Sequence, residues 1–395
     1  MSLRIVIITL LIGLFAGNAM CARPADASDS VRVSLLTCSP GTEIYALFGH
    51  TAIRYENPAQ GIDVAFNYGM FSFNTPNFIY RFVKGETDYQ LGVTDFPYFE
   101  AEYAMRNSSV TQQTLNLTKV EKERLWEILK ENYRPENRVY RYNFFYDNCT
   151  TRARDRIEDA IDGTVKYNEN NSEQSFRDIV HQYTKGHDWS EFGIDLLIGS
   201  DADKLIDYRE KMFAPFYLLN ALEGARIINK NGEERDMVLQ VEDVVTRVDE
   251  ETEKEFPVSP MGMSLALFML TLAFTVYGVK KNKMFWGLDI LLFGVAGLAG
   301  CVIAFLVFFS VHPAVRPNYL LFFLNPIHLF FLPFMTYLSI KRRKDPYHLI
   351  NFAVLTLFIV LWPVIPQRFN LAVLPLAACL LIRSANNIIL TYKRN

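Results

Sequence analysis

The stretch MGMSLALFMLTLAFTVYGV, residues 261–279, divides the chain into two parts that need different surroundings. It carries no charged residue, and its length matches the roughly 20 apolar residues that a helix needs to cross a bilayer. Further apolar runs follow, at residues 285–309, 319–340, 347–364 and 371–390. We therefore expect residues 257–395 to form an all-α domain of five transmembrane helices.

The loops between these runs predict the orientation in the membrane. Basic residues cluster after the first, third and fifth runs: Lys280, Lys281, Lys283, Lys341, Arg342, Arg343, Lys344, Lys393 and Arg394. The other two loops hold only Arg316 and Arg368. Because positive residues mark the cytoplasmic side, the first run passes inward, the C-terminus is cytoplasmic, and everything before the first run lies outside.

The N-terminus supports the same orientation. Residues 1–22 have the layout of a signal peptide, with Arg4, an apolar run over residues 5–15, and the small residues Gly17 and Ala19. We expect cleavage after Ala19, with an uncleaved anchor as the alternative. Cys21 is poorly placed for lipidation because Met20 precedes it. The predicted location is the inner membrane, with residues 23–256 in the periplasm.

Residues 23–256 show the mixed pattern of an α+β domain. Strands are predicted near residues 31–36, 52–55 and 63–68, with a turn at Gly69, and an aromatic strand near 140–146. Helices are predicted at 118–131, where Thr118 and Glu121 form a capping box, and at 150–161. The net charge of −3 and the absence of a basic stripe argue against nucleic acid as a partner.

Two short motifs in this domain suggest nucleophilic chemistry. Cys149, in DNCT, would stand at the start of a helix, with Asp147 and Asn148 as possible caps. A helix N-terminus lowers the pKa of a thiol, and its free N–H groups can hold an oxyanion. His50, in FGHT, leads into a strand and is the candidate general base.

A third group must orient the imidazole ring, and Asn67 is our candidate, with Tyr68 and Glu43 as rivals. A competing interpretation is a disulfide between Cys38 and Cys149, which an oxidising compartment would permit. We expect no metal, because no close pair of His and Cys has ligand spacing.

Polar residues near the third apolar run allow two interpretations. They either break and pack helices or line a pocket for a headgroup or acceptor that opens outward: His312, Asn318, Asn325 and His328. A group of aromatic residues in the outer domain is expected mainly in the core, with an apolar mouth near the lipid as the alternative: Phe71, Phe73, Phe78, Tyr80 and Phe82.

Several motifs resemble the periplasmic domain of the Lnb-type lipoprotein N-acyltransferases of Bacteroidota: SPG at 39–41, FGHTA at 48–52, NYG at 67–69 and DNCTTR at 147–152. The order of His before Cys is also similar to permuted NlpC/P60 and lecithin:retinol acyltransferase-like domains. The resemblance implies a papain-like, permuted NlpC/P60-like domain ahead of the membrane spans. Relatives of the retinol-acyltransferase type place a second His where this chain has Asn67.

The resemblance implies that Cys149 takes an acyl chain from a membrane phospholipid as a thioester, with His50 as base. The acceptor would be the α-amine of a diacylated lipoprotein, and no cofactor is expected. Candidate substrate-binding residues are Asn148, Asp147, Arg152, His312, Asn318 and Asn325. Two other functions stay open: a cell-wall peptidase of the NlpC/P60 type, and a non-catalytic membrane-tethered sensor or scaffold.

Overall fold

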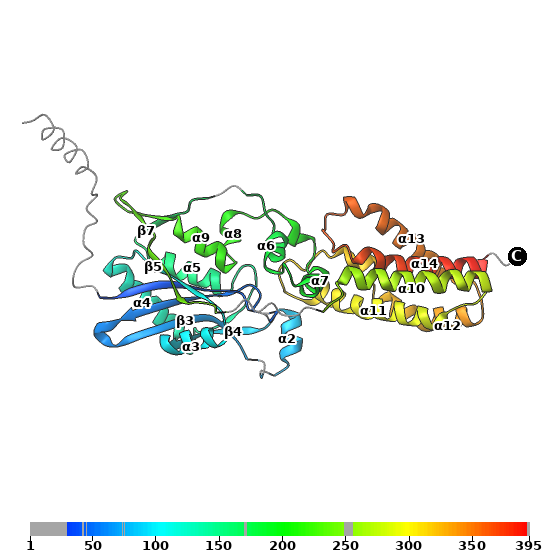
Figure 1. The fold of residues 1–395 in the computed structure, drawn as a ribbon, viewed down its shortest axis with the longest axis horizontal. Helices are drawn as coiled ribbons and strands as arrows, with labels where there is room; N and C mark the ends of the chain where they lie inside the picture. Colours follow the sequence, from blue (N-terminus) through cyan, green and yellow to red (C-terminus); the bar gives the residue numbers. More distant parts are fainter. Residues whose placement is uncertain are drawn as a thin grey trace, which may run out of the picture.

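The computed structural model describes residues 30–41, 43–44, 46–72, 74, 76–169, 172–248 and 256–392. The predicted signal peptide, Phe73, Lys393 and Arg394 lie outside these residues. Figure 1 shows a sheet-rich α+β domain at one end and a helical bundle at the other. This arrangement confirms the predicted fold class, an α+β domain followed by an apolar helical segment.

The outer domain is built on an antiparallel seven-stranded sheet with the order β10-β5-β1-β2-β3-β4-β6. Its strands are β1 (Arg32–Cys38), β2 (His50–Asn57), β3 (Ile62–Met70), β4 (Asp88–Asp95), β5 (Val110–Leu115), β6 (Val139–Arg141) and β10 (Val238–Val245). A separate three-stranded sheet consists of β7 (Gly163–Lys166), β8 (Arg226–Asn229) and β9 (Glu234–Asp236). Both faces of β1 are buried, since every residue from Val33 to Cys38 is buried.

Side chains alternate between the two faces of the large sheet. Val33 and Leu35 of β1 pack in the cluster that holds Leu125, while Leu36 and Cys38 pack in the cluster that holds Phe99. The first face is covered by α4 (Lys119–Tyr133), α5 (Cys149–Ala160) and α9 (Pro215–Glu223), and the second by α3 (Phe96–Met105). The sheet is therefore sandwiched between helices, with one apolar core on each side.

Helix α4 begins as predicted. The hydroxyl of Thr118 accepts a hydrogen bond from the N–H of Glu121, and the carboxylate of Glu121 accepts one from the N–H of Thr118. Val120 is 61% exposed, because the buried face of the helix holds Glu121, Leu125 and Leu129 at intervals of four residues and Val120 lies outside it.

Two local predictions were wrong. Gly69 does not end its strand in a turn: it lies within β3 at a φ of 95°, where the register with β4 shifts between Asn67 and Met70. The glycine therefore forms a bulge. The strand predicted at 140–146 stops at Arg141, because the side chain of Asn143 accepts the backbone N–H groups of Phe145 and Tyr146 and closes a turn.

Five helical segments in the described part of the chain are long and apolar enough to cross a membrane. They are α10 (Pro260–Lys281), α11 (Trp286–Phe309), the pair of η3 (Tyr319–Phe322) and α12 (Ile327–Ile340), α13 (Pro346–Leu361) with η4 (Trp362–Val364), and α14 (Val373–Tyr392). The third span is thus not one continuous helix. Asn325 and Pro326 interrupt it, and the side chain of Asn325 accepts the N–H of Ile327.

The remaining elements are short: η1 (Pro58–Gln60), α2 (Phe78–Lys84), α6 (Phe176–Tyr183), α7 (Asp188–Leu197), η2 (Ser200–Asp203) and α8 (Tyr208–Lys211). Figure 1 shows α6 and α7 between the sheet domain and the bundle. These two helices carry the contacts that join the parts.

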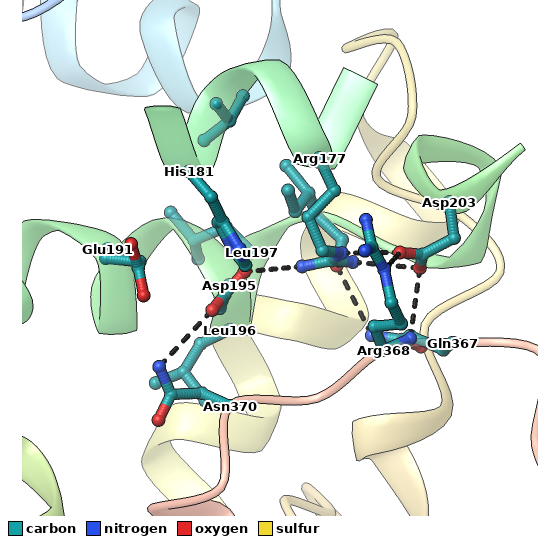
Figure 2. A network of polar contacts seen from close by, with 12 residues as sticks. Arg177, His181, Glu191, Asp195, Leu196, Leu197, Asp203, Gln367, Arg368 and Asn370 are labelled. Atoms are coloured by element: carbon teal, nitrogen blue, oxygen red, sulfur yellow. Dashed lines mark hydrogen bonds and ion pairs between the residues drawn. The ribbon is translucent and has the colours of Figure 1, made fainter. Parts of the chain in front are cut away.

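A network of ion pairs at this junction holds the outer domain on the membrane helices (Figure 2). The guanidinium of Arg177 on α6 is fully buried between Asp195, at 2.6 Å, and Asp203, at 2.7 Å. Arg368, from the outer loop before α14, bonds Asp203 at 3.1 Å, and Asn370 bonds Asp195 at 3.3 Å. Both carboxylates are therefore shared between the outer domain and the membrane domain.

Backbone contacts reinforce the same junction. The N–H groups of Gly199 and Ser200 donate to the carbonyls of Ala314 and Pro317, both at 2.8 Å. A Cβ on Gly199 would come within 2.3 Å of the Pro317 oxygen, so only glycine permits this approach. We call the set of Arg177, Asp195, Gly199, Asp203 and Arg368 the junction clamp, and it fixes the sheet domain relative to the bundle.

Candidate active site

A cavity of about 420 Å³ opens where β1 and β3 end and β2 begins. Its wall includes the three residues singled out as a catalytic set, His50, Asn67 and Cys149. Aromatic side chains form much of the remaining wall: Phe48, Phe71, Tyr89, Tyr103, Tyr142, Phe144 and Phe213. The cavity wall is therefore mixed, with these aromatic rings beside polar and charged side chains such as Glu102, Arg106 and Arg247.

Cys149 is the first residue of α5, and Asn148 holds the start of that helix. The Asn148 side-chain oxygen accepts the N–H of Thr150 at 2.8 Å and that of Thr151 at 2.9 Å. Its amide donates to the carbonyls of Phe144 and Phe213. Every polar group of this buried side chain is therefore engaged, so Asn148 positions the helix and has no capacity left for the substrate binding we expected of it.

The backbone N–H of Cys149 differs from its neighbours at the helix start. Among the described residues, no acceptor takes this N–H, whereas those of Thr150 and Thr151 are bound by the cap. An unengaged N–H beside the sulfur, at the positive end of a helix, is suited to stabilise negative charge on a bound carbonyl oxygen.

His50 begins β2, paired in register with Cys38 of β1. The preceding Gly49 has a φ of 74°, and a Cβ there would lie 2.5 Å from the Cys38 carbonyl oxygen. Nε2 of His50 donates to Oδ1 of Asn67 at 2.6 Å. The ring also hydrogen-bonds the thiol of Cys149, for which Nδ1 is the nitrogen that remains.

The pKa values of the pair shift in opposite directions. Burial disfavours the charged imidazole, but the Cys149 thiolate and the bonds from Cys149 and Asn67 outweigh it, so the pKa of His50 is raised. Burial also opposes the thiolate, yet His50, the backbone of Thr51 and the hydroxyl of Thr150 outweigh it, so the pKa of Cys149 is lowered. The site therefore favours a thiolate beside an imidazolium.

Neither of the other candidates for the third position, Tyr68 and Glu43, has a hydrogen bond to His50 among the described residues. The Tyr68 hydroxyl donates to Asn132 at 3.0 Å, and Glu43 lines the cavity without an assigned contact to His50. Cys38 and Cys149 are both free thiols, so the alternative disulfide is absent from the structure. Cys38 is fully buried, and this burial raises its pKa far above the ordinary value.

Most of the tentative substrate-binding residues have structural partners outside the cavity. Asp147 does not cap α5 but pairs with Arg152 at 2.6 Å, and the Arg152 guanidinium stacks 3.5 Å from the centre of the Tyr140 ring. Asn318 is buried at the junction, where its amide donates to the carbonyl of Leu196 at 2.9 Å. Asn325 caps α12. The structure thus assigns these side chains local contacts and does not bring them to Cys149.

His312 contacts α2 and lines a second, smaller cavity. It donates from Nε2 to the carbonyl of Phe82 at 2.6 Å. It also lines a second cavity of about 250 Å³ together with Asp147 and Tyr142. Tyr142 borders both cavities, so His312 is a neighbour of the main cavity and not part of its wall.

Tyr142 is the residue that our sequence analysis missed. It lines the main cavity, and burial followed by the charge of Cys149 raises its pKa well above the ordinary value. Its hydroxyl therefore stays protonated and can donate a hydrogen bond. The aromatic run at 140–146 was the available signal, but a strand assignment gave no reason to select one ring.

One group of possible metal ligands occurs in the described residues, outside the cavity. His181, Glu191 and Asp195 offer ligand atoms within 4.8 Å of one another. However, Asp195 already accepts from Arg177 and His181, and Figure 2 shows it engaged in the junction clamp. A guanidinium on one ligand opposes a second cation, so these residues fit a structural network better than a metal site.

Family models match both parts of the chain. The model described as the Lnb N-terminal periplasmic domain matches residues 23–186, and the one described as the Lnb transmembrane domain matches residues 251–395. No curated protein and no solved structure matches the chain. Helix α7 and η2, which carry Asp195 and Asp203 of the junction clamp, fall between the two matched ranges.

Proposed function

The chain belongs to the Lnb family, as a multi-pass membrane protein with an N-terminal periplasmic domain, and from this premise we propose that it is a lipoprotein N-acyltransferase. The acyl donor is a membrane phospholipid, and the acceptor is the α-amine of a diacylated lipoprotein. The observation that carries the proposal is that Cys149, His50 and Asn67 meet on the wall of one cavity, with His50 bonded to Asn67 and the pKa of Cys149 lowered by His50.

In the first half-reaction the Cys149 thiolate attacks the ester carbonyl carbon of the phospholipid. A carbon–sulfur bond forms, and the carbonyl oxygen becomes an oxyanion next to the N–H of Cys149 and the hydroxyl of Tyr142. The ester carbon–oxygen bond then breaks, and the imidazolium of His50 gives its proton to the leaving alkoxide. The products are a thioester on Cys149, a lysophospholipid and a neutral His50.

In the second half-reaction the lipoprotein amine attacks the thioester. A carbon–nitrogen bond forms, neutral His50 takes a proton from the attacking amine, and the carbon–sulfur bond breaks to restore the thiolate. A triacyl lipoprotein leaves, and the starting ion pair is regenerated. Water would compete with the amine, so excluding water from the cavity when substrate binds would favour amide formation over hydrolysis.

The test begins with the full-length protein in detergent with phospholipid. Intact-mass measurement should show one added acyl chain that hydroxylamine removes, and Cys149→Ser should show none. Adding a diacyl lipopeptide should discharge the thioester and increase the mass of the peptide by one acyl chain. Release of free fatty acid without a gain by the peptide would instead favour a hydrolase, and no adduct on folded wild-type protein would refute the proposal.

A further inference from the structure

Helix α2 presents an unusually apolar surface for an element outside the bundle. None of its residues is buried, and Ile79, Tyr80 and Phe82 are 78%, 56% and 48% exposed. The expectation that these aromatic residues belong mainly to the core is therefore wrong for α2. A contiguous exposed apolar patch of this kind marks an interaction surface.

Several contacts place α2 against the outer end of the membrane helix α11. The ring of Tyr80 lies 6.2 Å from that of Phe305. The N–H of Val311 donates to the carbonyl of Lys84 at 2.9 Å, and His312 donates to that of Phe82. Figure 1 shows α2 on the part of the sheet domain that faces the bundle. The helix therefore lies at the level where the bilayer meets the periplasm.

The close approach of the two segments depends on Gly85. This residue ends α2 at a φ of 78°, and a Cβ there would lie 2.8 Å from the backbone nitrogen of His312. A larger residue would push α2 away from the loop that follows α11. The position of α2 at the membrane surface is thus built into the packing.

A continuous series of aromatic rings leads from α2 to the cavity. Successive centroids are separated by 5.8 Å between Phe82 and Phe78, 6.1 Å between Phe78 and Phe71, and 5.0 Å between Phe71 and Tyr89. Tyr89 then stacks on Tyr142 at 4.1 Å. The last three rings line the cavity that holds Cys149, so this series of rings, which we call the aromatic lane, runs from the exposed helix to the wall of the cavity.

We propose that α2 lies in the outer leaflet and that this aromatic lane admits one acyl chain of a membrane phospholipid sideways from the bilayer to Cys149. The inference rests on the proposed function, because it names the route of the donor into the same site. Continuity with α11 identifies the occupant as lipid, since the series of rings begins beside the outer end of that membrane helix and is built of apolar ring faces.

The position of α2 is tested without reference to activity. In full-length protein reconstituted in phosphatidylethanolamine vesicles, Tyr80 is replaced by the photo-crosslinker p-benzoylphenylalanine. Irradiation should attach phospholipid to the protein. The matched control is the same replacement at Tyr98 on α3, which is 71% exposed. Equal lipid attachment at both positions, or attachment of a second copy of the chain at position 80, would overturn the inference.

The role of the lane is tested by comparing two donors. Vesicle phospholipid must enter through the bilayer, whereas dihexanoyl phosphatidylcholine below its critical micelle concentration reaches the cavity from water. In the double variant Ile79→Ser with Phe82→Ser, acylation of Cys149 from vesicles should fall at least about tenfold more than acylation from the soluble donor. The control pair Val120→Ser with Leu239→Ser, at residues that are 61% and 64% exposed, should match wild type.

The outcomes separate the two proposals. If wild type gains an acyl chain from vesicles and the α2 variant does so equally well, the lane is refuted while the acyltransferase stands. If wild type gains no acyl chain from either donor, although iodoacetamide alkylates Cys149 and spares the fully buried Cys38, as only the folded domain would allow, the proposed function is refuted and the lane with it.

Discussion

Replacing Asn67 by alanine should change the pH dependence of the site on one side only. The Asn67 oxygen accepts from Nε2 of His50 at 2.6 Å, and this bond is among the causes that raise the pKa of His50. A hydrogen bond to a charged group contributes about 1.5–3 kcal/mol. The neutral ring also donates to Asn67, in a bond that contributes about 0.5–1.5 kcal/mol, so only the difference of about 1–1.5 kcal/mol acts on the pKa. At about 1.4 kcal/mol for each pKa unit, the loss of Asn67 should lower the pKa of His50 by about one unit.

The sign of the effect follows from the two titration steps. As the pH rises from acid, Cys149 first loses its proton beside an imidazolium that is present before and after the step, so Asn67 has little influence on this limb. At higher pH the imidazolium loses its Nδ1 proton, and Asn67 stabilises the charged ring more than the neutral ring, which still donates from Nε2. The alkaline limb of the acylation profile should therefore move to lower pH by about one unit, while the acid limb stays in place.

The assay is the rate of Cys149 acylation by dihexanoyl phosphatidylcholine, followed by intact mass across a pH series. Asn132→Ala is the matched control, because it removes a hydrogen bond of 3.0 Å to Tyr68, the next residue along β3, without touching His50. An alkaline limb that stays in place in Asn67→Ala, or that moves equally in the control, would show that Asn67 does not act through the imidazolium.

Other perturbations address the remaining parts of the site. Tyr142→Phe should lower the acylation rate by about a hundredfold or more if its hydroxyl holds the oxyanion, with unchanged thermal stability; a rate near wild type would remove Tyr142 from the mechanism. Asn148→Ala should cost about 2–4 kcal/mol, since it removes a helix cap and strands two buried carbonyls, and the urea midpoint of the detergent-solubilised protein measures this. A loss below about 0.5 kcal/mol would contradict the cap assignment. Cys38→Ala should leave acylation within about twofold of wild type, because Cys38 is a buried neutral thiol; abolished acylation with an intact fold would revive a role for Cys38.

The membrane spans and the positions of Cys149 and His50 could be predicted from the sequence because they depend on local signals. Five apolar runs with alternating basic loops need no tertiary information. Cys149 was predictable because Asn148 is a strong helix-capping residue that precedes a helical stretch. Likewise, Gly49 ahead of a β-rich stretch gave His50 its place at the start of β2.

The rest depends on contacts between distant segments. Seven residues of α2 are too few for a helical pattern to be recognised. The place of α2 beside α11 depends on contacts such as the bond from His312 to Phe82, which lie far apart in the sequence. Asn318 and Arg368 looked like loop residues, yet each bonds a carbonyl or carboxylate more than a hundred positions away. Tyr142 enters the cavity only because the turn at Asn143 ends β6 early.

The junction clamp has a consequence for which molecules can react. The ion pairs of Asp203 with Arg177 and Arg368, and the backbone hydrogen bonds of Gly199 and Ser200, attach the outer domain to the membrane domain. The sulfur of Cys149 is therefore held at one height relative to the membrane helices. This attachment fixes the level in the membrane at which a reacting group can meet the sulfur. Under the proposed function, a glycerol ester or a lipoprotein amine would come within reach only when its own anchoring in the leaflet sets it at the same level, so the membrane would select the substrates before any bond is broken.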